Sequence, residues 1–312
     1  MTEQSTAPRP QRRPPEQRET RIVSARSSVW RRLETLWSDR ELVTHLSRTD
    51  IKVKYKNSAL GLVWSLVSPL MQLAIYYFVF QVVLKNGVPD FVIFLFAGLM
   101  VWNFFQGSIT TSTGIIVERS GIVKKVSFPR EILPLSAVGA QVVYFVMQLI
   151  PMAAFLLIVG VNPDWSLAWL LFPALAALLV MASALSVLFS ALNVKARDMK
   201  HLVEIAMMAW FWLTPIVYSF EYQLSKQLHN LHLTWLYLAN PMTPIVLTFQ
   251  RVFYPHVQIV NTRTGALETI QPTWPATTYA LLDVAVLVVG AALFVGAVSV
   301  FGRLEGNFAE EL

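Results

Sequence analysis

The chain has 312 residues, of which 55% are hydrophobic and only 14% carry a charge. A soluble domain has about 25% charged residues, so the composition excludes an ordinary soluble domain and predicts an integral membrane protein. The 25 Lys and Arg outnumber the 19 Asp and Glu, but cytoplasmic loops of membrane proteins collect such cations, and we expect no nucleic-acid binding. Because there is no cysteine, disulfides, thiolate catalysis and cysteine-bound metals are excluded.

The N-terminal region is polar and lacks the apolar stretch of a secretion signal. Residues 1–28 are rich in Pro, Arg, Gln and Ser, which predicts a disordered cytosolic tail. In residues 29–48 the apolar side chains recur at roughly helical spacing, and most of the Arg side chains fall between them. This pattern predicts an amphipathic helix in the membrane interface. A soluble amphipathic helix is the alternative.

Six segments are long and apolar enough to cross a bilayer core, which takes about 20 helical residues. The predicted spans are about 58–84, 91–113, 132–160, 166–192, 201–220 and 276–301. Of the 25 Lys and Arg residues, 21 then fall on one side of the membrane. Because cytoplasmic loops are the positive ones, we expect a transmembrane domain over 49–302, a short cytosolic tail over 303–312 and both termini in the cytoplasm.

The extracytoplasmic segment 221–275 has an apolar middle that does not read as a seventh span. Asn240-Pro241, Pro244, Gln250 and Arg251 interrupt it, and such residues argue against a simple membrane helix. We expect two short helices broken near Asn240-Pro241. Whether 233–254 re-enters the membrane or lies on its surface is open. The following "NTRTGALETIQPTWP" has turn signals and alternation that favour a small hairpin.

The sequence offers little that indicates catalysis. No GxxxxGK[ST] motif is present, so the chain is not its own P-loop ATPase. His201 and Glu204 are one helical turn apart, which suits a metal, but a boundary His beside a solvated Glu is the preferred interpretation. Asp283 and Glu204 are the only acids within the predicted spans, both near an end. We therefore expect no catalytic residue, no metal and no cofactor bound by this chain.

Cations and aromatic residues are the more informative features. In "RTDIKVKYKNSALGLVWSLVSPL" the residues Arg48, Lys52 and Lys56 are spaced i, i+4, i+8 directly before the first span. A helix would place them on one side, although the alternation from Ile51 to Lys56 also suits an extended segment.

Aromatic residues crowd the first, second and fifth spans. Lipid-facing or interfacial rings are normal in membrane proteins; the alternative is a path on which flat rings stack against sugars. The candidate channel aromatics are Tyr76, Tyr77, Phe80, Trp102, Phe105, Trp210, Trp212 and Tyr218.

The chain resembles the permease subunit of ABC-2 type polysaccharide exporters. The segments that carry the resemblance are "DIKVKYKNSALGLVWSLVSPL", "KKVSFPREILPLS", "NVKARDMKHLV" with "WFWLTPIVYS", "LANPMTPIV" and the closing "FGRLEGNFAEEL". They occur in family order over nearly the whole chain after about residue 29. These Wzm/TagG-like proteins move O-antigen, teichoic acid or wall galactan across the bacterial inner membrane. The outer "VQIVNTRTGALETIQP" is similar to the wall-galactan exporters of actinobacteria.

The resemblance implies a fold and a mechanism. Two permeases would form one tunnel, with spans one and five at their interface, and two separate nucleotide-binding subunits would hold ATP and Mg in a 2+2 complex. The loop 114–131 would contain a coupling helix, with Glu118, Arg119, Lys124 and Lys125 as its polar contacts to the ATPase. For the two lysines, simple positive-inside anchoring is the alternative. The short outer helices would be extracytoplasmic gate helices.

The resemblance also implies a substrate, a glycan on a polyprenyl pyrophosphate. Arg48, Lys52 and Lys56 would then hold the pyrophosphate at headgroup depth through charge-assisted hydrogen bonds, with membrane anchoring as the alternative. An ABC-2 permease for a lipid or drug is the second interpretation. A secondary transporter or a membrane-embedded transferase working without an ATPase is more distant.

Overall fold

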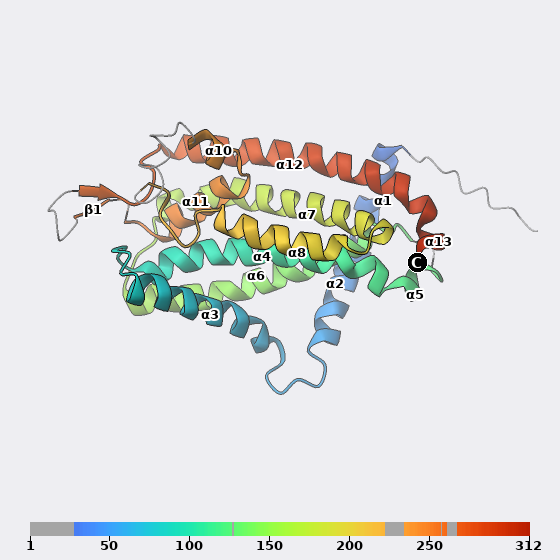
Figure 1. The fold of residues 1–312 in the computed structure, drawn as a ribbon, viewed down its shortest axis with the longest axis horizontal. Coiled ribbons are helices and arrows are strands. Elements are labelled where there is room, and N and C mark those ends of the chain that lie inside the picture. Colours follow the sequence, from blue (N-terminus) through green and yellow to red (C-terminus); the bar gives the residue numbers. More distant parts are fainter. Residues whose placement is uncertain (1–27, 127, 222–233, 257, 261–266) are drawn as a thin grey trace, which may run out of the picture.

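The structure is a computed structural model that describes residues 28–126, 128–221, 234–256, 258–260 and 267–312. The predicted tail over 1–28 therefore lies almost entirely outside the described residues, as do residues 222–233, 257 and 261–266 of the segment 221–275. The long helices run side by side along the long axis of the molecule (Figure 1). A two-stranded antiparallel hairpin of β1 (Gln258–Val260) and β2 (Leu267–Thr269) lies at one end of the molecule. The turn signals predict a hairpin over 261–275, and the observed one begins earlier, at Gln258.

Five helical runs in the described part are long and apolar enough to cross a membrane. They are Gly61–Val83 (η1, α3 and η2), Phe91–Glu118 (α4), Ile132–Val159 (α6), Trp165–Lys195 (η3 and α7) and Ala276–Leu304 (α12). Each begins within three residues of a predicted span. The expectation of a helical membrane fold is thereby confirmed.

The predicted fifth span, 201–220, is shorter than expected. Helix α8 (Met199–Trp212) has 14 residues, so it is about 21 Å long, less than the roughly 30 Å of a bilayer core. The chain leaves the helix at Leu213, two residues before Pro215, which has no N–H to continue the ladder. By length and composition the described part supports five spans, one fewer than the predicted six.

Helix α4 forms the centre of the bundle. Of its most apolar stretch 78% is buried, and it packs against α6, α7, α8 and α11 (Met242–Phe253). Helix α12 packs along α7, where Gly290 lets the two backbones approach: a Cβ at that position would lie 3.3 Å from the Met181 nitrogen. Most apolar side chains of α4 are therefore used for packing within one chain.

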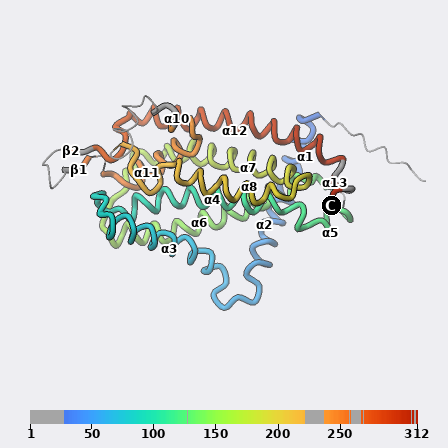
Figure 2. Tube along the Cα trace, viewed as in Figure 1, coloured from blue at the N-terminus to red at the C-terminus, as the bar shows by residue number. Residues whose placement is uncertain are grey.

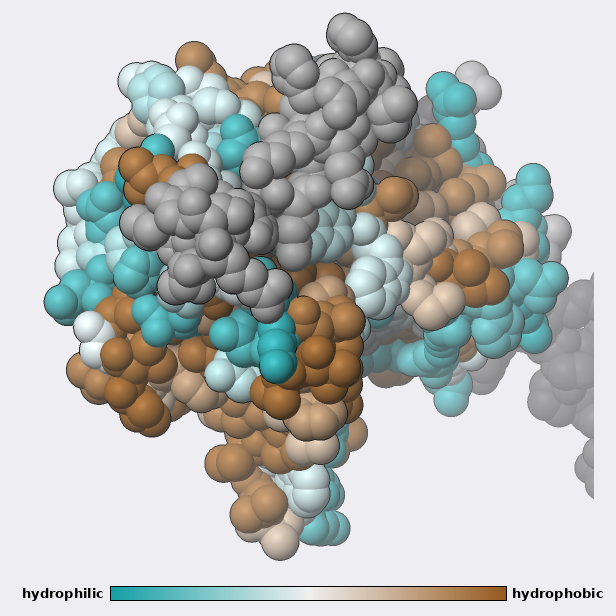
Figure 3. Space-filling view, turned by 60° about the vertical axis from the view of Figure 1, so that its left-hand side comes forward, coloured by the Kyte–Doolittle hydropathy of each residue, from teal (hydrophilic) through white to brown (hydrophobic). Residues whose placement is uncertain are grey.

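Helix α3 (Trp64–Tyr77), in contrast to α4, is mostly unburied within the chain: only 6% of the most apolar stretch of its helical run is buried. Its exposed side chains include Trp64, Met71 and Ile75. Figure 2 shows α3 at the edge of the bundle, and Figure 3 shows hydrophobic residues over the lower part of the molecule, where α3 lies. This surface is suited to contact with lipid or with another membrane helix.

The N-terminal amphipathic region is two helices, where one was expected over 29–48. Helix α1 (Val29–Ser38) ends at Asp39, and α2 (Arg40–Lys54) begins at the next residue. Helix α2 packs on α6: Ser47 Oγ donates a hydrogen bond to the Ser136 carbonyl at 2.8 Å. The absence of a side chain at Gly139 permits this approach, since a Cβ there would clash with Ser47 Oγ.

An ion-pair cluster fixes α1 to the rest of the chain. Arg32 Nη1 donates to Glu131 Oε1 at 2.5 Å and to Glu305 Oε2 at 2.8 Å. Glu131 is only 2% exposed, and this burial raises the pKa of its carboxyl above the ordinary value in spite of the hydrogen bond from Arg32. Arg32 therefore provides the compensating charge for a buried carboxylate.

We expect Arg32→Ala to destabilise the protein by about 2–3 kcal/mol, because it leaves the buried Glu131 carboxylate without a partner. A carboxyl group whose pKa is higher in the folded than in the unfolded state stabilises the fold at pH values below its unfolded-state pKa. This contribution is lost as the pH rises through the folded-state pKa. The melting temperature of Arg32→Ala should therefore lie closer to wild type at pH 5 than at pH 8. Arg31→Ala, on the exposed side of the same helix, is the matched control. If the melting temperature of Arg32→Ala lies equally far below wild type at pH 5 and at pH 8, Arg32 does not act by compensating the Glu131 charge.

Candidate functional site

The predicted cationic segment lies at the end of α2. Arg48 and Lys52 belong to the helix and are exposed, so the helical alternative holds for them. Lys56 follows the helix end at Tyr55, so the three cations do not share one helical face. The connection from α2 to α3 projects from the bundle (Figure 1). All three side chains are accessible from outside the chain, as a pyrophosphate contact requires.

The predicted coupling loop is the corner between α4 and the short α5 (Ser120–Val123). Arg119 forms an ion pair with Asp50 of α2, and both side chains are partly buried. Glu118 accepts from Lys200 Nζ of α8 at 3.1 Å, on a more exposed surface. The corner is thus joined to two other helices at the same end of the bundle.

The other two predicted coupling residues, Lys124 and Lys125, follow α5 and are exposed. In the described part of the chain neither side chain has a recorded partner. They are free to contact another subunit or lipid headgroups. Contact with an ATPase and positive-inside anchoring therefore both remain predictions for these two lysines.

The predicted aromatic residues from three helices do come together. Tyr76 of α3 stacks on Phe211 of α8 with ring centroids 5.4 Å apart. Trp210 of α8 meets Phe105 of α4 edge to face at 5.2 Å. These contacts join α3 to α8 and α8 to α4. The rings act first as packing groups between helices.

Only part of the aromatic set faces outward. Trp102 and Phe105 are 1% and 0% exposed, so in this conformation both rings pack within the bundle, and their channel role stays a prediction. Phe80 and Trp210 are half-buried. Tyr77 and Trp212 are 37% and 50% exposed, which makes them the strongest remaining candidates for a path on the α3–α8 side.

The predicted break in the outer segment is present, and Asn240 fixes it. The segment forms α10 (Thr234–Ala239) and α11, separated at Asn240-Pro241. Asn240 Oδ1 accepts from Trp210 Nε1 at 2.8 Å and from the Met242 N–H at 3.0 Å, and its Nδ2 donates to Thr214 Oγ1 at 3.0 Å. One side chain therefore fixes the start of α11 to the end of α8.

Helix α11 is almost entirely buried between α4, α7 and α12. Asp283 of α12, which the sequence placed near the end of a span, is fully buried and accepts from Thr248 Oγ1 of α11 at 2.8 Å. Gln250 Nε2 donates to the Pro215 carbonyl at 3.2 Å. Side-chain hydrogen bonds thus fix α11 on two sides. Its depth in a membrane stays a prediction.

We expect Asn240→Ala to loosen the outer helices, since it removes four side-chain hydrogen bonds at one point, the fourth being from Asn240 Nδ2 to the Leu213 carbonyl at 3.2 Å. The expected cost is about 2–3 kcal/mol. Hydrogen exchange should accelerate in α11 and at the end of α8 while α6 is unaffected. Asn86→Ala, which removes one side-chain acceptor for the Val88 N–H, should have the smaller effect. Equal protection of α11 in Asn240→Ala and wild type would argue against this role.

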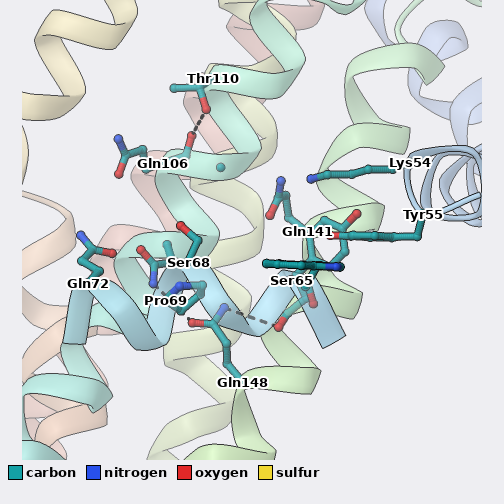
Figure 4. A pocket seen from close by; sticks show the side chains of 14 residues that line it. Lys54, Tyr55, Ser65, Ser68, Pro69, Gln72, Gln106, Thr110, Gln141 and Gln148 are labelled. Atoms are coloured by element: carbon teal, nitrogen blue, oxygen red, sulfur yellow. Dashed lines mark hydrogen bonds between the residues drawn. The ribbon is translucent and has the colours of Figure 1, made fainter. Parts of the chain in front are cut away.

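A polar cavity of about 440 Å³ opens between α2, α3, α4 and α6 (Figure 4). Its lining is dominated by carboxamides and hydroxyls, with Lys54 and Tyr55 at the α2 side. The polar side chains are Gln72, Asn103, Gln106, Gln141, Gln148, Ser65, Ser68 and Thr110. Among the described lining residues none is acidic. Three of the helices are candidate spans, so this polar space lies within an otherwise apolar layer.

Reasoning from the sequence did not identify the cavity, although a signal was present. On α3 the polar residues Ser65, Ser68 and Gln72 recur at helical spacing, and Gln141, Tyr144 and Gln148 do the same on α6. A polar stripe inside an apolar helix indicates a face directed away from lipid. At the α2 side of the cavity, Lys54 Nζ lies 5.0 Å from the centroid of the Tyr144 ring.

No group of three or more metal-ligating side chains occurs in the described residues. His201 Nδ1 lies 3.6 Å from Glu204 Oε2, and both side chains are exposed. This geometry agrees with the interpretation as a boundary His beside a solvated acid.

Comparison with known proteins places this arrangement in a family. A family profile described as ABC-2 type transporter matches residues 41–254. An O-antigen export system permease protein RfbA of Klebsiella pneumoniae is 30% identical over 74% of this chain and 88% of its own length. A second RfbA from that organism is 29% identical over 87% and 95%, respectively. RfbA of Myxococcus xanthus is 30% identical over 72% and 85%. The chain belongs to the ABC-2 type transporter family, and its resemblance to the polysaccharide-export permeases of that family is confirmed.

Proposed function

We propose that this chain is the membrane permease of an ATP-driven exporter that moves a polyprenyl-pyrophosphate-linked polysaccharide across the bacterial inner membrane. The observation that carries the proposal is the similarity to O-antigen export permeases over 72–87% of the chain. Those relatives are matched over 85–95% of their length, so the similarity is not confined to one segment of a permease. An O-antigen-like glycan or a cell-wall galactan is the cargo we propose.

ATP hydrolysis is assigned to a separate subunit that carries ATP and Mg. The sequence has no P-loop, and the α4–α5 corner offers Lys124 and Lys125 as exposed cations for a partner. Two permeases and two ATPases form the complex, with the exposed face of α3 at the contact between permeases. Both termini are cytoplasmic, so that the α4–α5 corner and the cations of α2 meet the ATPase side.

Substrate capture is assigned to the end of α2. Arg48, Lys52 and Lys56 are exposed beside the first candidate span, where they donate charge-assisted hydrogen bonds to the pyrophosphate. The exposed rings of Tyr77 and Trp212 give the glycan a surface on which sugar faces stack.

The test is transport by purified components. Inverted proteoliposomes that contain the permease and its ATPase should take up a lipid-linked glycan when ATP is supplied, and should not when the ATPase carries a Walker A lysine-to-alanine change. ATP-dependent movement of a phospholipid or a drug, with none of the glycan, would move the assignment to another ABC-2 cargo class.

A further inference from the structure

The polar cavity between α2, α3, α4 and α6 contains amide groups that packing does not explain. In the described part of the chain, neither Gln72 nor Gln141 makes a side-chain hydrogen bond, yet both line the cavity. Carboxamides without partners are unfavourable in an apolar layer. Their donors and acceptors are available to a ligand.

The shape of the cavity depends on a glycine. A Cβ at Gly107 would lie 2.8 Å from Gln141 Oε1, so the missing side chain leaves Gln141 room beside α4. Asn103 of α4 and Gln148 of α6 face each other, and Asn103 Nδ2 donates a hydrogen bond to Gln148 Oε1 at 3.4 Å. The volume of about 440 Å³ is within the roughly 300–1,000 Å³ range of small-molecule sites.

The charges of the cavity lining indicate which class of ligand fits. Lys54 is the one charged group among the described lining residues, and it lies at the α2 end over the rings of Tyr55 and Tyr144, at 5.6 and 5.0 Å. The rest of the lining is neutral and both donates and accepts hydrogen bonds, as sugar hydroxyls do. Trp64, half exposed at the rim, adds a flat apolar face. A ligand that matches is a neutral polyol with an anion at one end.

We propose that this cavity binds the sugar units next to the pyrophosphate of the lipid-linked glycan, with Lys54 contacting the phosphate and Gln72 and Gln141 hydrogen-bonding sugar hydroxyls. This rests on the proposed function and gives it a specificity site separate from the exposed cations Arg48, Lys52 and Lys56. The lipid chain remains outside the cavity.

The experiment measures equilibrium binding to the full chain in lipid nanodiscs by calorimetry. The probes are farnesyl pyrophosphate carrying a disaccharide and farnesyl pyrophosphate alone. The test variant is Gln72→Leu with Gln141→Leu, which preserves side-chain size and removes the hydrogen-bonding groups. Gln81→Leu is the matched control, because Gln81 lies on the same helical run outside the cavity. Its Oε1 is buried and has no hydrogen-bond partner among the described residues. Melting temperatures establish that each variant is folded.

We expect the double variant to bind the glycosylated probe about tenfold more weakly, as the loss of two hydrogen bonds predicts, and the sugar-free probe as wild type does. Lys54→Gln should weaken both probes, and Gln81→Leu neither. Unchanged affinity of the double variant for the glycosylated probe overturns the inference. Equal wild-type affinity for both probes overturns it while leaving a lipid-linked substrate in place. Wild-type protein that binds neither probe contradicts the lipid-linked substrate itself.

Discussion

Replacing Arg119 with Ala is expected to reduce polysaccharide export by about tenfold or more while the permease still binds its ATPase. The Arg119–Asp50 ion pair is the partly buried link between the α4–α5 corner and α2, and α2 leads directly into α3. A push on the corner therefore moves α2 through this contact. A partly buried charge-assisted pair of this kind contributes about 1–3 kcal/mol.

The control for this prediction uses a second ion pair at the same corner. Lys200 and Glu118 are 43% and 61% exposed, and a pair so exposed contributes less than about 1 kcal/mol. Lys200→Ala should therefore leave export almost unchanged. The exchange Asp50→Arg with Arg119→Asp should recover much of the activity, because the pair is restored with reversed polarity. Normal export by Arg119→Ala would exclude coupling through this contact.

Neutralising Arg48, Lys52 and Lys56 together, each to Gln, should lower export about tenfold or more without preventing membrane insertion. Each charge-assisted hydrogen bond to a phosphate contributes about 1.5–3 kcal/mol to binding. Because these side chains are exposed, we expect each contribution to lie at the lower end of that range. Lys54 remains to support the cytoplasmic placement of this end.

Export and membrane content are measured in the same cells. Arg31→Gln, an exposed cation of α1, is the matched control and should export normally. If the triple variant fails to insert, the cations serve only as anchors. Normal export by an inserted triple variant would equally exclude the pyrophosphate contact.

The sequence predicts the long helices well because their apolar runs exceed the length that a bilayer requires. Helix α8 is shorter than predicted for a local reason: the chain leaves the helix at Leu213, ahead of Pro215. A count of apolar residues does not detect such a helix end. The separation of α1 from α2 at Asp39 was also missed, since an approximate apolar periodicity continues through it. Both errors concern where a helix ends, which depends on single residues.

The site was less predictable because it depends on contacts between distant residues. Arg32 meets partners 99 and 273 positions away, and no spacing rule identifies such pairs. The polar stripes of α3 and α6 are visible in the sequence, but only the fold shows that they line one cavity together with α4. The burial of Trp102 and Phe105 likewise follows from the central place of α4, which its composition does not reveal.

The most direct test of the central claim is to purify the tagged full chain from its native membranes and identify the proteins that accompany it. The account predicts a soluble subunit with a Walker A motif in about equal amount, and ATPase activity in the complex that is lost when the Walker A lysine is replaced. Recovery of a stable, transport-competent permease without any ATPase would contradict the account and favour a transporter that works alone.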